Sequence, residues 1–426
     1  MNLGLIPSLS IFVFIVSYVF ITFEHKFKAS KSAIALMCAG LLWLLASTTV
    51  SEDVLEHALT TAGNDIFGLV VFLLCAMTLV EVMTHLNFFD FIQTKLNNLG
   101  FGYLKLFWSI SILTFFLSAV FDNLTVTIIM LQIARNFYKK ESMFAMAANI
   151  VIAANAGGAW SPIGDVTTIM LWLAEKFSAV EIIMNAFIPS FVLNFVSTYL
   201  LSRHIREEDY VQTENDGSNI QLPTNMKIII GVAMISFLFP VFMNLIGLPP
   251  YIGLALGLGV VWTLYELLPF NDPHTDTEVK MDHLLKKADL SSLKFFIGIL
   301  LSVAALESMG VLEILSHFVF GDEPSYMQLV VGNVAMGLFS AIVDNVPLTA
   351  LSINMLDIVD PKIWSLTALA VGTGGSCLVI GSASGIIAQG MVEGLTFGKY
   401  LKIATIPAFV GYVSAIFVWI LQNNLV

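Results

Sequence analysis

Charged residues are scarce in this chain of 426 residues: Asp, Glu, Lys and Arg together make up 12% of it. A soluble domain carries about 25% charged residues. With 57% hydrophobic residues, the scarcity excludes a water-soluble globule. Basic residues are the rarer sign, 19 against 31 acidic ones, and the net charge of −12 argues against a nucleic-acid partner. Cysteine is also rare, and Cys38, Cys75 and Cys377 lie in apolar stretches, so no disulfide framework is predicted.

Apolar stretches long enough to cross a bilayer recur along the whole chain. A transmembrane helix needs about 20 mostly apolar residues. The candidate spans are 9–23, 33–49, 66–86, 145–174, 179–202, 226–246, 251–269, 293–311, 363–390 and 402–422. The first follows neither a basic segment nor a small-residue cleavage site, so we interpret it as a retained span. The sequence predicts an all-α polytopic membrane protein whose main partner is the lipid bilayer.

Two further apolar stretches, 103–136 and 326–356, are interrupted by Asp122-Asn123 and Asp344-Asn345. The limb that follows each pair is too short to recross about 30 Å of hydrocarbon. We therefore expect two re-entrant hairpins, each entering and leaving on one side of the membrane. Irregular backbone at that depth is tolerated only where it is buried in protein or lines a cavity.

The two halves of the chain repeat each other. Residues 118–124 (SAVFDNL) match residues 340–346 (SAIVDNV). Glu81 and the Gly157-Gly158 pair have counterparts, in the same order, in Glu307 and the Gly374-Gly375 pair. An internal duplication is predicted from these matches. Its parts are a first repeat 1–202 (hairpin 103–136, broken helix 145–174), a linker 203–225 and a second repeat 226–426 (hairpin 326–356, broken helix 363–390).

The orientation follows from counting crossings and basic residues. Each repeat holds five crossings and one hairpin, and because five is odd, the second repeat is inverted relative to the first. With the N-terminus outside, 17 of the 19 basic residues fall on one side, and Lys176 and Lys362 fall on the other. The positive-inside rule makes the richer side cytoplasmic. We expect a multi-pass inner-membrane protein with a cytoplasmic linker and both termini outside.

Five carboxylates lie within the apolar segments, those of Glu81, Asp122, Asp165, Glu307 and Asp344. No Lys or Arg lies deep in a span to pair with them, and an ionised carboxylate at mid-membrane costs a few kcal/mol. Such acids can be protonated, bind a cation or lie in a hydrated cavity. Competition between H⁺ and a cation for the same oxygens is the physical basis of cation/proton exchange.

Hard oxygen ligands surround three of these acids. The candidate cation ligands are Asp122, Asn123, Thr125, Asp165, Thr167, Thr168, Asp344, Asn345, Thr349, Ser382 and Ser384. Carboxylate, amide, hydroxyl and carbonyl oxygens suit Na⁺ or Li⁺, by the same logic that makes oxygen the ligand of Ca²⁺ and Mg²⁺. No cofactor is predicted, since the cation and the proton are the transported ions.

The segments 145–174 and 363–390 are not expected to be regular helices throughout. Breaks are expected at Gly157, Gly158 and Pro162 in the first segment, and at Gly374 and Gly375 in the second. Proline lacks the amide hydrogen and glycine adopts conformations closed to other residues, so both interrupt a helix. We expect these discontinuous helices to expose backbone carbonyls near the bilayer midplane.

Simpler roles compete for each acidic residue. Asp122, Asp165 and Asp344 could serve only as helix N-caps. Glu81 and Glu307 sit inside long spans where no cap is needed. They could form hydrogen bonds between helices, or handle protons in a second tier behind the aspartates.

The hairpin tips and residues 157–168 (GGAWSPIGDVTT) resemble NhaD-type Na⁺/H⁺ antiporters of the ion transporter superfamily. The resemblance covers nearly the whole chain and is most specific over 155–172. Dicarboxylate transporters of this superfamily carry Ser-Asn-Thr at the tips. Here Asp122 and Asp344 stand in place of that Ser, which fits a cation better than an anion.

The resemblance also implies an assembly and a mechanism. It implies a homodimer in which hairpins and broken helices form a transport domain that moves like an elevator against a scaffold domain. One departure concerns the second broken helix, where Ser382 and Ser384 stand near the place of Asp165 in the first. We therefore expect the two half-sites to be chemically unequal.

The function predicted from these residues is electrogenic exchange of cytoplasmic Na⁺ or Li⁺ for external H⁺ by a transporter that is not an enzyme. One alternative is an anion or metalloid transporter of the same architecture, for dicarboxylates or arsenite. Another is an intramembrane aspartyl protease with an Asp dyad. The sequence around Gly164-Asp165 matches the Gly-x-Gly-Asp motif of such proteases only loosely, because Pro162 stands at its first position.

Overall fold

The computed structural model describes residues 4–22, 24–27, 29–211, 222–269, 279–321, 324–356 and 358–424. Across these ranges the chain forms helices joined by short turns, with one antiparallel bridge between Tyr138 and Tyr210 and no strand. The predicted all-α class is confirmed.

The first half contains ten α-helices and one short 3₁₀ helix in its described residues. They are α1 (Leu5–Thr22), α2 (Glu24–Phe27), α3 (Lys31–Ala46), α4 (Glu52–His85), α5 (Phe88–Asn98), α6 (Tyr103–Leu117), α7 (Asn123–Ala134), α8 (Lys140–Gly158), α9 (Val166–Leu173), α10 (Ala179–Ser202) and η1 (Glu207–Asp209).

The second half contains twelve α-helices and one short 3₁₀ helix in its described residues. Its helices are α11 (Thr224–Ser236), α12 (Phe239–Leu245), α13 (Pro250–Leu267), α14 (Met281–Leu285), α15 (Leu290–Ser308), α16 (Val311–Phe320), α17 (Tyr326–Phe339), α18 (Asn345–Met355), α19 (Pro361–Gly374), η2 (Gly375–Cys377), α20 (Ala383–Met391), α21 (Phe397–Ile403) and α22 (Thr405–Asn424).

Local sequence signals account for where several helices begin. Ser178 precedes α10 and Ser325 precedes α17. Each serine accepts a hydrogen bond from the third residue of its helix, Glu181 or Gln328, whose side chain accepts one from the backbone amide of the serine. Such capping boxes satisfy two amides that a helix start leaves unpaired.

Seven helical segments in the described ranges are long and apolar enough to cross a membrane. They are Leu5–Thr22, Glu52–His85, Ala179–Ser202, Thr224–Leu245, Pro250–Leu267, Leu290–Ser308 and Thr405–Asn423. The other three expected spans differ: α3 has 16 residues, and the segments at 145–174 and 363–390 are divided into α8–α9 and α19–α20. These apolar helices indicate an integral membrane protein.

Helix α4 is longer than the apolar run expected at 66–86. It begins at Glu52 and has 34 residues, which is about 50 Å at 1.5 Å per residue. Its first turns carry the exposed acids Glu52, Asp53, Glu56 and Asp65. Acidic residues form helix well near a helix N-terminus but give no hydropathy signal, so the apolar run marks only the later part of the helix.

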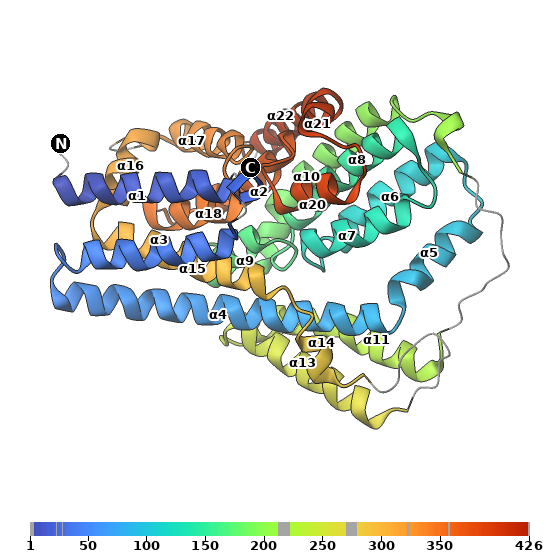
Figure 1. The fold of residues 1–426 in the computed structure, drawn as a ribbon, viewed down its shortest axis with the longest axis horizontal. Coiled ribbons are helices and arrows are strands. Elements are labelled where there is room, and N and C mark those ends of the chain that lie inside the picture. The colour runs from blue at the N-terminus through green and yellow to red at the C-terminus, as the bar shows by residue number, and fades with distance from the viewer. Residues whose placement is uncertain are drawn as a thin grey trace.

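The helices pack into two groups. In the scaffold group, α1 packs on α3, α3 on α15, α15 on α4, and α4 on α13, which α11 and α12 also contact. In the core group, α8 and α19 are contacted by α6, α7, α10, α17, α18 and α22, with α9 and α20 packed on the hairpins. Figure 1 shows α1, α3, α15 and α4 side by side, with α4 extending along much of the molecule.

Corresponding helices of the two halves make corresponding contacts. Helix α6 packs on α8 as α17 packs on α19, and α10 and α22 pack on each other. The second limbs of the hairpins make contacts between the halves: α7 of the first hairpin contacts α20, and α18 of the second hairpin contacts α9. Each hairpin therefore meets the broken helix of the other half.

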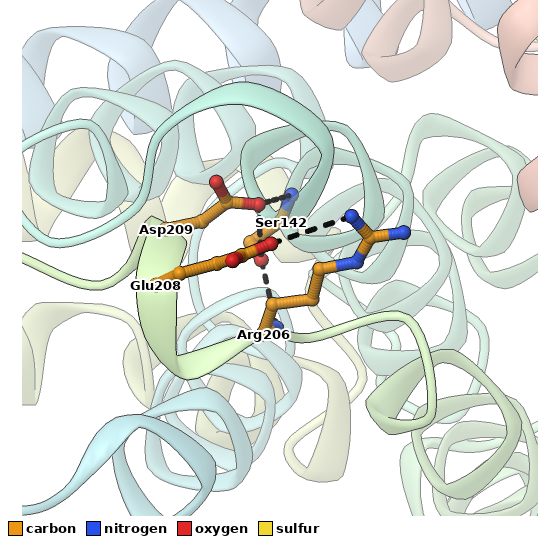
Figure 2. A network of polar contacts seen from close by, with 4 residues as sticks. All are labelled: Ser142, Arg206, Glu208 and Asp209. Atoms are coloured by element: carbon orange, nitrogen blue, oxygen red, sulfur yellow. Dashed lines mark hydrogen bonds and ion pairs between the residues drawn. The ribbon is translucent and has the colours of Figure 1, made fainter.

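The segment that begins the predicted linker 203–225 is packed on the core group. Asp209 is 4% exposed, and its carboxylate accepts hydrogen bonds from the amide and hydroxyl of Ser142, at 3.4 and 3.1 Å (Figure 2). The Ser142 hydroxyl in turn accepts one from the amide of Arg206 at 2.9 Å. Residues 212–221 of the linker lie outside the described residues. The residue before α8 is Lys139, whose side chain has no hydrogen-bond acceptor and cannot cap the helix. Asp209 instead accepts the hydrogen bond of an amide in the first turn of α8.

Candidate functional site

Each hairpin turns at its Asp-Asn pair, between α6 and α7 in the first half and between α17 and α18 in the second. The serine four residues before each Asp fixes the turn in the same way. The Ser118 hydroxyl donates to the carbonyl oxygen of Ala154 at 2.7 Å, and the Ser340 hydroxyl donates to that of Val371 at 2.9 Å. Both turns are therefore held on the first limbs of the broken helices, α8 and α19.

Paired glycines end the first limbs of both broken helices, α8 at Gly158 and α19 at Gly374. A Cβ on Gly157 would overlap the carbonyl group of Phe115 in α6, and one on Gly374 would overlap that of Gly337 in α17. Any larger residue would push hairpin and broken helix apart, so these positions require glycine for close approach. The glycines thereby place each hairpin tip at the break.

Asp165 is the last residue of the segment 159–165, which contains Pro162 and separates α8 from α9. It is 1% exposed. Its Oδ2 accepts a hydrogen bond of 3.2 Å from Nδ2 of Asn345, at the tip of the second hairpin, and no capping bond from the described amides of α9. A Cβ on Gly372 of α19 would lie 3.4 Å from the same oxygen, so this glycine leaves space beside the carboxylate. Among the described residues, no ion pair involves Asp165.

A network of amides and hydroxyls from both halves surrounds the break of the second broken helix. Ser382 is the N-cap of α20 and accepts a hydrogen bond of 3.2 Å from its third residue. Asn123 of the first hairpin tip donates to Oδ1 of Asn155 at 3.0 Å, and Nδ2 of Asn155 donates to the hydroxyl of Ser376 at 2.8 Å. Ser384 donates to the backbone carbonyl of Asn123 at 3.2 Å. These neutral groups therefore find hydrogen-bond partners in one another.

The two tip aspartates differ in how they are used. Asp122 caps α7, since its Oδ1 accepts a hydrogen bond of 2.9 Å from the amide of Thr125. Asp344 precedes α18 but accepts no capping bond from the described amides of that helix, because Pro347 stands where Thr125 does and lacks an N–H. The amide of Asp344 donates to the hydroxyl of Tyr18 at 2.8 Å. The Asp344 carboxylate is therefore available to the cavity beside it.

That cavity has a volume of about 390 Å³ and lies between the core and scaffold groups. Its lining includes six of the candidate ligands, Asp122, Asn123, Thr125, Asp165, Asp344 and Asn345, together with Glu81. The other candidates, Thr167, Thr168, Thr349, Ser382 and Ser384, are buried outside this lining. The structure thus brings together the acids and amides of both hairpin tips and of the first break.

Two of the buried threonines bond to their own helices. The hydroxyl of Thr349 donates to the carbonyl oxygen of Asn345 at 2.9 Å, and that of Thr168 donates to the carbonyl oxygen of Asp165 at 2.8 Å. Each hydroxyl oxygen keeps lone pairs for a further partner.

Two lysines that the sequence pattern did not single out also line the cavity. Lys31 begins α3, and Lys287 lies between α14 and α15. Both lie outside the apolar runs, so the sequence places them at the ends of spans. Packing of the scaffold group turns them toward Glu81 and the hairpin tips, and no pattern within either segment predicts that.

Within the part of the chain that the structure describes, no three His, Cys, Asp or Glu side chains gather closely enough to hold a metal ion. Asp122, Asp165 and Asp344 share one cavity but do not form a cluster of three carboxylates. An alkali cation beside Asp165 would therefore need amide, hydroxyl and carbonyl oxygens as further ligands.

Glu307, the counterpart of Glu81, faces another cavity. This cavity has a volume of about 770 Å³ and is lined by Glu307 together with Lys176 and Asp65. The two glutamates therefore occupy separate spaces, each with a lysine nearby.

Comparisons with known proteins relate this chain to transporters. Residues 18–372 match the citrate transporter family, CitMHS. The chain is 35% identical to sodium/proton antiporter 2 of Arabidopsis thaliana, with 97% of this chain and 99% of the relative aligned. It is 31% identical to the Na⁺/H⁺ antiporter NhaD of Vibrio cholerae, over 97% of this chain and 91% of the relative. It is 29% identical to NhaD of Halomonas elongata, over 97% and 88%.

Proposed function

The chain belongs to the citrate transporter family and, within it, to the NhaD-type antiporters, and on this basis we propose that it exports cytoplasmic Na⁺ or Li⁺ in exchange for external H⁺. Cation/proton antiport is the activity for which these relatives are named. The direction of exchange, the ligands and the mechanism are our proposals for this chain.

The observation that carries the proposal is the buried carboxylate of Asp165. Its Oδ2 contacts the amide of Asn345, and it lines the cavity together with the Asp344 carboxylate. A buried carboxylate must bind a proton or a cation, since an unpaired charge at such a position is costly. Alternate occupancy of Asp165 by H⁺ and by Na⁺ couples the two fluxes.

We assign the cation to the first half-site. Its ligands are Asp165, Asn345 and Asp344, with Thr167, Thr168 and Thr349 close to them along α9 and α18. Asp122, Asn123 and Thr125 form the adjacent tip, and Ser382 and Ser384 complete the second half-site.

Sequence register supports a single primary site. When the two glycine pairs are aligned, Gly372 corresponds to Asn155. The glycine leaves room beside Asp165, whereas the amide of Asn155 bonds to Ser376 and Asn123 in the second half-site. A neutral amide there takes the space that a cation would need.

The packing suggests how the site reaches both sides. Because the cavity lies between the two helix groups, a movement of the core group against the scaffold group would close it and open another, as in an elevator. In this scheme the two repeats are inverted, the hairpins are re-entrant and the cavity with Lys31 and Lys287 faces the cytoplasm. Both termini are outside the inner membrane, and the protein is a homodimer. Glu81 and Glu307 handle protons in a second tier.

The test is antiport by the purified protein in proteoliposomes, followed with a pH-sensitive dye while Na⁺, Li⁺ or K⁺ is added at several pH values. We expect Na⁺ and Li⁺ to drive H⁺ movement. The apparent KM should rise as the pH falls, by up to about tenfold per unit where one proton competes for the site. Proton movement driven by citrate, a dicarboxylate or arsenite, and not by Na⁺ or Li⁺, would reject this function in favour of an anion or metalloid transporter.

A further inference from the structure

A tyrosine of the scaffold group contacts the tip of the second hairpin. Tyr18 lies near the C-terminal end of α1 and is 9% exposed. Its hydroxyl oxygen accepts a hydrogen bond of 2.8 Å from the backbone amide of Asp344. This bond joins the two helix groups at the residue whose carboxylate lines the cavity.

The first hairpin has a counterpart of this contact. Residues 17–20 (SYVF) match residues 236–239 (SFLF), so Phe237 corresponds to Tyr18. The ring of Phe237 packs edge-on against that of Phe121 in the turn of the first hairpin, with ring centroids 5.4 Å apart and an interplanar angle of 78°. Both hairpin tips are therefore contacted by an aromatic residue of the scaffold group, and the second contact adds a hydroxyl.

The second tip depends on this hydroxyl more than the first tip would. Asp122 fixes its own turn by capping α7 through the amide of Thr125, whereas Pro347, in the first turn of α18, lacks the equivalent amide donor. A buried amide without a partner is costly, and Tyr18 supplies the partner for Asp344. Tyr18 of the scaffold group thus holds the second tip through the Asp344 amide, whereas Asp122 holds the first tip from within through the Thr125 amide.

We propose that Tyr18 is a positioning residue for antiport: its hydroxyl holds Asp344 and Asn345 beside Asp165 while the cavity of about 390 Å³ is open. The inference rests on the proposed antiport. Movement of the core group against the scaffold group breaks the bond. The bond therefore favours one conformation, and a cation that binds this conformation binds more tightly while the bond is intact.

The first test is Tyr18→Phe, which removes the hydroxyl and keeps the ring. Because one hydrogen bond is lost, we expect the apparent KM for Na⁺ in proteoliposomes to rise about 2- to 10-fold, with the maximal rate within about twofold. Phe237→Tyr is the matched control at the capped tip and should leave the KM within about twofold. An unchanged KM in Tyr18→Phe, or the same rise in both variants, would overturn the proposal.

The second test does not depend on transport. Hydrogen–deuterium exchange of the purified protein reports the protection of the Asp344 amide through a peptide covering 340–348. In Tyr18→Phe this amide should exchange about 2- to 10-fold faster, while the peptide covering 118–126 keeps its wild-type rate. Unchanged exchange of the Asp344 amide refutes the tether, as does general loss of protection across both peptides.

The two tests separate the possible failures. If the wild-type protein moves no protons in response to Na⁺ or Li⁺ while the Asp344 amide still loosens in Tyr18→Phe, the antiport function fails and the tether stands. If antiport is normal and the amide loosens without any change in KM, the bond exists but does not position the site, and the proposal fails.

Discussion

The two half-sites place different side chains on similarly arranged hairpins and broken helices. Ser118 and Ser340 make equivalent bonds to the broken helices, and Gly157 and Gly374 each let the first limb of a hairpin approach its broken helix closely. Yet the first break presents the carboxylate of Asp165, and the second presents the hydroxyl of Ser382 at the same place. The shared contacts build two similar frames, and one side chain decides the charge that each frame can hold.

The half-sites also differ at a second pair of equivalent positions. The carboxylate of Asp165 has Gly372 beside it, while the position equivalent to Gly372 in the other half is Asn155, which bonds to Asn123 and Ser376. Space beside the Asp165 carboxylate allows an ion to bind and dissociate. A satisfied amide network suits a fixed structural contact. The comparison therefore assigns ion exchange to the first half-site and packing to the second.

The largest effect should come from removing the charge of the first half-site. We expect Asp165→Asn to lower Na⁺-driven proton movement at least about 100-fold. The interaction of two unit charges 4 Å apart is about 4 kcal/mol at an effective dielectric of 20. Every 1.4 kcal/mol is tenfold in affinity. Asn keeps the size of the side chain and its contact with Asn345, so the charge alone is tested.

The control is Ser382→Ala, which alters the equivalent position of the second half and should change the rate by less than about threefold, because it removes one neutral hydrogen bond. Both variants are compared in proteoliposomes at equal protein content after gel filtration. Near-normal exchange by Asp165→Asn would remove this residue from the mechanism, and equal losses in both variants would end the distinction between the half-sites.

The sequence predicts much of this arrangement because its signals are local. Apolar runs mark the helices, the Asp-Asn pairs mark the hairpin turns, and Gly158 and Gly374 stand where the first limbs of the broken helices end. The presence of Ser382 in the place of Asp165 also predicts that the two half-sites are chemically unequal. Each of these features is written within a few neighbouring residues.

What the sequence does not predict depends on contacts between distant segments. Asn345 meets Asp165 across the two halves, and Lys31 and Lys287 reach the cavity only through packing of the scaffold group. Asp209 of the predicted linker is buried, and its carboxylate bonds to Ser142 of α8. Tertiary packing decides these placements, and no periodicity along the chain encodes them.

A smaller effect should separate the two tip aspartates. We expect Asp344→Asn to reduce antiport about tenfold more than Asp122→Asn, a difference of about 1.4 kcal/mol. Both residues line the cavity, but the carboxylate of Asp122 is engaged in a cap that Asn can also form. Stability should show the opposite order. Asp122→Ala loses the cap and should lower the free energy of unfolding by about 0.5–2 kcal/mol, more than Asp344→Ala.

Antiport assays and thermal unfolding in detergent measure the two orders. If Asp122→Asn proves the more harmful to antiport, the cation lies nearer the first tip and the assignment of the half-sites must be reversed.

The smallest effect on transport is expected where the broken helices begin. Helix α19 is capped by its own Asp360, which accepts a hydrogen bond of 2.9 Å from the amide of Lys362, whereas α8 relies on Asp209 of the linker through Ser142. Asp209→Ala leaves buried donors unpaired and should lower the free energy of unfolding by about 1–3 kcal/mol. Asp360→Ala loses an ordinary cap and should lower it by about 1 kcal/mol.

Asp209 contacts the first turn of α8 and Asp360 precedes α19. Both substitutions therefore act at the helix ends away from the breaks, and the KM for Na⁺ should stay within about twofold in each. Thermal unfolding in detergent and Na⁺ titration of antiport measure the two quantities, and Asp209→Asn, which keeps an acceptor for Ser142, should recover part of the stability. A change in KM with Asp209→Ala alone would mean that the linker acts on the ion site through α8. The two halves would then differ in control as well as in charge.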